Sequence, residues 1–139
     1  MNKAIIEKAG KIIASRTGAE HFCTMAQIDL DGFPTAAAVS ASKTQGIEWL
    51  TFCTGLKSNK ALRVEKDNRA SICFNDTTYN ITLVGRLEIL TDEETKKDMW
   101  YEGLANHFSG VDDPNYCVLR FVTERYSLLV DWVEVAGVV

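Results

Sequence analysis

Residues 47–66 read IEWLTFCTGLKSNKALRVEK, and the fold prediction starts from this segment. An apolar run over residues 47–53 favours a buried strand. A loop of hydroxyl, amide and lysine side chains follows over residues 54–60, and apolar residues at helical spacing continue as far as Lys66. We therefore predict a strand, a short polar loop and a helix that begins at Asn59.

The loop has the side chains of an anion site. The free N–H groups and the dipole at the start of a helix attract negative charge. Thr54 and Ser58 can add hydroxyl donors, Asn59 an amide, and Lys57 or Lys60 a full positive charge. The loop lacks the Walker pattern and the three glycines of a dinucleotide fingerprint. A phosphate site is our hypothesis, and a solvated turn capped by Ser58 or Asn59 is the alternative.

Length, charge and cysteine spacing narrow the class of protein. The 139 residues predict a single domain over residues 1–139. The net charge of −4, without a basic tail, argues against nucleic-acid binding. No apolar run reaches the roughly 20 residues of a membrane span, and residues 1–15 favour an amphipathic helix over a signal peptide. The four cysteines lack metal-site spacing, so we expect no metal and a cytoplasmic location.

The remaining pattern is rich in strands. Strands are predicted over residues 24–30, 33–42, 47–53, 69–75, 79–90, 116–122 and 125–133. Asp31-Gly32 predicts a two-residue hairpin, and the first three strands suggest an antiparallel meander. Thr91 and Glu94 form a capping box that begins a helix extending toward Leu104. These elements predict a mainly β barrel or sandwich with a few helices.

Several segments together resemble the pyridoxamine 5'-phosphate oxidase-like family of FMN-binding split barrels, and in particular its small general-stress-protein branch. The similar segments are residues 34–39, 50–54 with 58–60, 70–74, 80–85, and the C-terminal pattern that runs from Trp100 through 107–120. Their order and spacing extend over about 100 residues of the chain. The resemblance implies a six-stranded antiparallel Greek-key split barrel with an N-terminal helix and short flanking helices.

The resemblance also implies a cofactor, a partner and a set of site residues. The cofactor would be FMN, bound at two sites in the interface of a homodimer. It would be held by small residues, an apolar wall, hydrogen-bond donors of the loop, an amide facing the flavin and a tryptophan from the partner subunit. The residues that this implies are Ala37, Ala38, Val39, Phe52, Cys53, Thr54, Ser58, Asn59, Lys60, Asn80 and Trp100.

The chain departs from the family pattern in two places. Residues 35–38 lack the arginine that commonly helps to hold the phosphate, and residues 125–128 lack the arginine–histidine substrate motif of the true oxidases. We therefore do not predict vitamin B6 oxidation. The first hypothesis is an FMN-dependent oxidoreductase of unknown substrate, without an assigned catalytic residue. The alternatives are a non-catalytic flavin-binding or stress-related module, a deazaflavin protein, and a haem protein with His21 or His107 as axial ligand.

Overall fold

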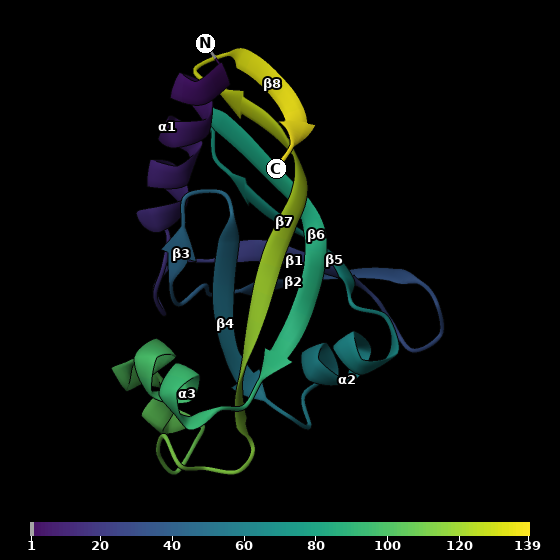
Figure 1. Cartoon of the computed structure of the whole chain (residues 1–139), viewed down its shortest axis with the longest axis vertical. Helices are drawn as coiled ribbons and strands as arrows, with labels where there is room; N and C mark the ends of the chain where they lie inside the picture. The colour runs from purple at the N-terminus through teal and green to yellow at the C-terminus, as the bar shows by residue number, and fades with distance from the viewer. Residues whose placement is uncertain (1) are drawn as a thin grey trace.

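The computed structural model describes residues 2–139, in which a strand-rich body carries short helices (Figure 1). The helical elements are α1 (Asn2–Ala14), α2 (Asn59–Lys66), α3 (Glu93–Met99) and the 3-10 helix η1 (Glu102–Asn106). The strands are β1 (Cys23–Ile28), β2 (Pro34–Val39), β3 (Thr44–Gln45), β4 (Trp49–Gly55), β5 (Arg69–Asn75), β6 (Tyr79–Leu90), β7 (Tyr116–Val130) and β8 (Val133–Val138). No helix in this part of the chain has the length and apolar character to cross a bilayer.

The strands form one antiparallel sheet in the order β2-β1-β5-β6-β7-β4-β3, and β8 pairs with β7. The chain after β2 returns to the other end of the sheet. There the Ser42 N–H donates to the Thr51 carbonyl at 2.7 Å, and the Thr51 N–H donates to the Lys43 carbonyl at 2.9 Å. These bonds link the two ends of the sheet, and the predicted mainly β, split-barrel-like fold is confirmed.

Strand number and strand pairing differ from the sequence prediction. Within residues 2–139 the sheet has eight strands, not six. The predicted meander of the first three strands holds only in part, because β2 pairs with β1, whereas β4 pairs with β7 and with the short β3 that follows β2 along the chain. Hydrophobic alternation predicts that a segment is a strand and which face is buried, but it does not identify the neighbouring strand.

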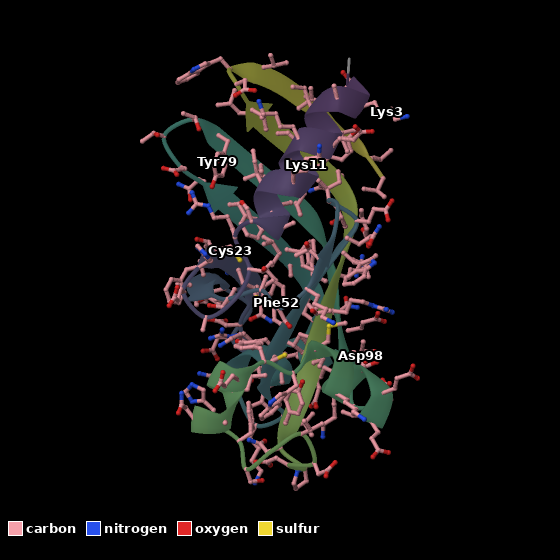
Figure 2. The ribbon with its side chains drawn as sticks, turned by 90° about the vertical axis from the view of Figure 1, so that its left-hand side faces the viewer. Lys3, Lys11, Cys23, Phe52, Tyr79 and Asp98 are labelled. Atoms are coloured by element: carbon pink, nitrogen blue, oxygen red, sulfur yellow. The ribbon has the colours of Figure 1, made fainter. Side chains whose placement is uncertain are left out.

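The core lies inside the barrel. Large side chains from the inner faces of four strands are almost fully buried, including Phe52, Phe74, Leu83 and Phe121. Ile13 of α1 is buried against the same core. Figure 1 shows β7 along the molecule, with α1 and β8 near one end and α2 and α3 near the other. Figure 2 shows Phe52 near the middle of the molecule, and the lysines Lys3 and Lys11 on α1.

A β-bulge lies where the sequence predicted a break between two strands. Val84 faces Arg125 and Gly85 faces Thr123, so Glu124 is the extra residue on β7. A bulge keeps the strand continuous while it adds twist and changes the face of the residues that follow. Glu124 and Arg125 are therefore both exposed, and this interrupts the alternation. The prediction of separate strands over 116–122 and 125–133 is wrong, because β7 runs unbroken to Val130.

One turn prediction and one helix-cap prediction are also wrong. The Asp31-Gly32 turn is longer than two residues, because the Asp29 N–H donates to the Phe33 carbonyl and Asp29 Oδ1 accepts from the Phe33 N–H. The N-cap of α3 is Asp92, which accepts from the Thr95 N–H at 3.0 Å. A side-chain acceptor one residue further along can cap the helix equally well, so capping residues locate a helix start only to within a residue or two.

The bulge makes Gly85 irreplaceable by residues with a side chain. A Cβ atom at position 85 would lie 2.0 Å from the Val122 carbonyl oxygen, a backbone atom that cannot rotate away. We expect Gly85→Ala to lower the free energy of unfolding by about 1–3 kcal/mol or more, as for other overpacked sites, measured by urea denaturation. Gly103→Ala is the matched control, because its Cβ would meet its nearest neighbour at 3.6 Å. Equal effects of the two substitutions would contradict the close approach.

Candidate functional site

A cavity of about 600 Å³ lies between the end of β4, the start of α2 and the segment after α3. Its apolar wall is formed by Phe52 and Cys53 of β4 with Ala38 and Val39 of β2. Polar loop residues line one part of the cavity, and aromatic residues of the 101–108 segment line another. Such a pocket, in which converging polar groups meet apolar and aromatic walls, is typical of a small-molecule site.

Ser58 organises the polar part of the cavity. It is the N-cap of α2, and its Oγ accepts from the Ala61 N–H at 3.3 Å. The same oxygen accepts from the Thr54 hydroxyl at 3.0 Å. Because both bonds use Ser58 as an acceptor, its own hydroxyl proton stays available to a ligand. The helix begins at Asn59 as predicted, so its first N–H groups lie beside this hydroxyl.

Asn115 holds the loop from the opposite side. Its carbonyl accepts from the Leu56 N–H at 2.7 Å, and its Oδ1 accepts from the Lys57 N–H at 3.2 Å. A Cβ atom at Gly55 would lie 2.7 Å from Asn115 Nδ2, so a larger residue there would displace the Asn115 side chain. Asn115 is itself held by Asp113, whose Oδ1 accepts from the Asn115 N–H. Two loops far apart in the sequence therefore form one rigid corner of the cavity.

The charge around the cavity is positive. Lys57 and Lys60 line it, and no carboxylate of the described residues does. Neither lysine forms an ion pair within residues 2–139. The buried Gln27 donates from Nε2 to the Lys60 carbonyl at 3.0 Å, which anchors the first turn of α2 to β1. A lysine with several neutral donors is a suitable set for a phosphate monoester.

The aromatic part of the cavity comes from the segment after α3. Tyr101, His107 and Phe108 line it. Tyr116 of β7 is fully buried, and its hydroxyl donates to the Lys96 carbonyl at 2.6 Å, which fixes α3, the helix that precedes this segment. Phe108 packs against the Tyr116 ring with centroids 5.3 Å apart. The aromatic wall is therefore part of a packed cluster, and it offers ring faces on which a flat ligand can stack.

The cavity contains a thiol that is not activated. The Cys53 thiol donates to the Met99 carbonyl at 3.3 Å, and burial raises its pKa above the ordinary value. A neutral thiol is a weak nucleophile and a weak metal ligand. Residues 2–139 also contain no cluster of three or more His, Cys, Asp or Glu side chains placed to hold a metal ion.

The structure brings together most of the residues predicted from sequence. The predicted residues that line this one cavity are Ala38, Val39, Phe52, Cys53, Thr54, Ser58 and Lys60. Four others do not line it. Ala37 lies on β2, Asn59 lines a separate hollow with Arg63, Asn80 lies on β6, and Trp100 packs edge-on against Tyr116 of its own chain. Whether these residues bind a flavin stays a prediction.

Sequence reasoning missed several lining residues as ligand contacts. The sequence predicts no site role for four residues that line the cavity, namely Phe22, Ser40, Leu104 and Asn115. The segment containing Asn115 was part of the family resemblance, but its place beside Gly55 follows from the β4–β7 register, in which Gly55 pairs with Tyr116. No local sequence signal reports that register. Phe22 precedes β1 and is 66% exposed at the cavity, which hydrophobic patterning does not predict.

Solved structures with the same fold extend over the whole chain. A protein related to general stress protein 26, from Clostridium acetobutylicum, superimposes with a TM-score of 0.84 and 21% identity, covering 100% of this chain and 97% of that one. General stress protein 26 from Bacillus anthracis gives a TM-score of 0.80 and 15% identity, covering 96% and 98%. A heme binding protein from Mycobacterium smegmatis gives a TM-score of 0.73 and 18% identity, covering 96% of this chain and 57% of that one.

The family assignment comes from the sequence itself. A comparison with curated protein sequences finds no match. The family model described as pyridoxamine 5'-phosphate oxidase matches residues 11–130, which include every strand from β1 to β7 and both loops at the cavity. The chain therefore belongs to the pyridoxamine 5'-phosphate oxidase family.

Proposed function

We propose that this protein binds FMN and acts as an oxidoreductase of unknown substrate. The observation that carries the proposal is a single cavity that joins a donor-rich helix start to apolar and aromatic walls. FMN has a phosphate at one end and a wide flat ring at the other, so it requires both features in one site. The residues present fit this cofactor at each end.

The phosphate would lie at the start of α2. The Ser58 hydroxyl, the first N–H groups of the helix and the Lys60 ammonium would hold it, with Lys57 nearby. Residues 35–38 supply no arginine, so the lysines carry the positive charge alone. The absence of a carboxylate from the lining removes a source of repulsion.

The ring would lie against Phe52 and the β2 residues Ala38 and Val39, across from the aromatic 101–108 segment. When bound, flavin supplies hydride and electron transfer. The chain would bind the ring, orient it and exclude water from one face. The Cys53 thiol is not activated and no carboxylate of residues 2–139 lines the cavity, and we assign no residue as general acid or base.

We further propose that the functional unit is a cytoplasmic homodimer. Phe22 leaves two thirds of its surface exposed at the cavity, where a second subunit would cover it. Asn80 lies away from the cavity of its own chain, so a contact between Asn80 and flavin would require a second copy. All four cysteines are free thiols, which suits a reducing compartment.

A visible spectrum of the purified protein tests the proposal. Flavin absorption bands, with FMN released on denaturation, would support it. A colourless protein that does not bind added FMN would overturn it. Turnover is a separate question. If NAD(P)H reduces bound FMN no faster than free FMN and no electron acceptor turns over, the protein is a non-catalytic flavin-binding module.

Lys60 is the most direct test of the phosphate position. We expect Lys60→Ala to weaken FMN binding by about 1.5–3 kcal/mol, because a charge-assisted hydrogen bond is lost, with little effect on folding. Fluorescence quenching of FMN on titration with protein measures the affinity. Lys3→Ala is the charge-matched control, because Lys3 is exposed on α1, which contributes no residue to the cavity (Figure 2). Unchanged affinity in Lys60→Ala would mean that the phosphate binds elsewhere.

Haem is a second candidate ligand, because His107 lines the cavity whereas His21 does not. If haem is the ligand, added haem should give a shifted Soret band that His107→Ala abolishes and His21→Ala leaves in place. A Soret band that is identical in wild type and His107→Ala would argue against an axial role for His107. Competition between haem and FMN would show whether both enter the same cavity.

The oligomeric state is measured independently of colour. We expect multi-angle light scattering at micromolar concentration to give twice the chain mass of 15.5 kDa. We also expect Phe22→Asp to weaken the dimer, because a charge would be buried at the subunit contact. A monomeric wild-type protein would remove the two-subunit site.

A further inference from the structure

A second hollow lies on the outer face of the barrel, away from the candidate flavin cavity. It has a volume of about 450 Å³ and is formed by β1, β5, β6 and β7. Small outward-facing residues, among them Ala26, Ser71 and Val84, line it. It shares no lining residue with the cavity described above.

Three arginines from three adjacent strands meet at this hollow: Arg69 of β5, Arg86 of β6 and Arg125 of β7. Arg69 and Arg86 are directly opposite each other in the β5–β6 register. Like charges that face each other across strands destabilise a sheet unless other groups compensate them. The bulge adds the third arginine, Arg125, because the extra residue on β7 leaves Glu124 and Arg125 both exposed.

The carboxylates nearby compensate only part of this charge. Arg69 pairs with Asp67, and Arg86 pairs with Glu124 through Nε. Arg125 forms no ion pair or side-chain hydrogen bond with residues 2–139. Three positive charges therefore face two negative ones, in a chain whose net charge is −4.

The arginines also keep free hydrogen-bond donors. Arg69 uses Nε and Nη2 on Asp67, which leaves Nη1 free. Arg86 uses Nε on Glu124 and Nη1 on Asn68, which leaves Nη2 free. Arg125 has all five N–H groups available. Guanidinium groups with free donors match the planar, two-pronged geometry of a carboxylate or phosphate.

We propose that this hollow is a binding site for a small molecule with a phosphate or carboxylate group, separate from the candidate flavin cavity. The anion would bind between Arg125 and the free edges of Arg86 and Arg69, and it would relieve the repulsion across the β5–β6 pair. The two salt bridges hold the guanidinium groups of Arg69 and Arg86 in place before the ligand arrives.

The proposal is tested by titrating ¹⁵N-labelled protein with inorganic phosphate in a buffer that contains no other phosphate and no carboxylate. We expect saturable shifts of the backbone amide signals of Ala70 and Gly85, at the floor of the hollow. Arg125→Ala should weaken this binding at least about tenfold, as expected for loss of a charge-assisted bond. Arg125→Lys should lose part of the affinity, because lysine keeps the positive charge but lacks the two-pronged donor geometry of the guanidinium group.

Two controls separate this site from the flavin cavity. Lys60→Ala should leave the shifts at Ala70 and Gly85 unchanged. Arg120→Ala, which removes an arginine of the same strand that pairs with Glu88 outside the hollow, should leave them unchanged as well. A parallel titration with malonate shows whether phosphate or carboxylate binds more tightly. No saturable shift with either anion, or equal affinity in Arg125→Ala with native unfolding behaviour, would overturn the proposal.

Discussion

The close approach of β6 to β7 at Gly85 is the constraint on which the rest of the barrel depends. The backbone of β7 comes so near that no side chain fits at position 85. This contact sets the bulge, and the bulge lets β7 continue as one strand from Tyr116 to Val130 while it changes which residues face inward. A single long strand can therefore pair with β6 along its length, with β4 over one part and with β8 over another.

The candidate flavin cavity follows from the position of β7. Its first residue, Tyr116, pairs with Gly55, the last residue of β4. The loop before β7 and the loop after β4 must therefore meet, and Asn115 joins them by two hydrogen bonds. Tyr116 also fixes α3 through its hydroxyl and the aromatic segment through its ring. One strand end thus positions the polar corner and the aromatic wall together, which gives a two-ended ligand a rigid site.

The two hollows have different electrostatic designs. In the candidate flavin cavity, neutral donors and two lysines face a space that no carboxylate of the described residues lines. A bound anion would be attracted to the lysines and would not compete with an internal carboxylate. On the outer face, the arginines are already partly paired, and the excess charge resides on Arg125. Local charge therefore matters more than the overall charge of −4, since solvent screens interactions between exposed charges beyond about 10 Å.

Much of this protein could be predicted from its sequence, because the deciding signals were local. Helix α2 begins at Asn59, and the strand–loop–helix over 47–66 formed as expected, since capping and hydrophobic periodicity act within a few residues. Family resemblance extended this to the barrel fold. Only the tertiary structure decided which strands pair, that β7 is unbroken, and that Asn115 and His107 line the same cavity as Ser58. These facts depend on register and on contacts between different segments of the chain, and the pattern of side chains within any one segment does not contain that information.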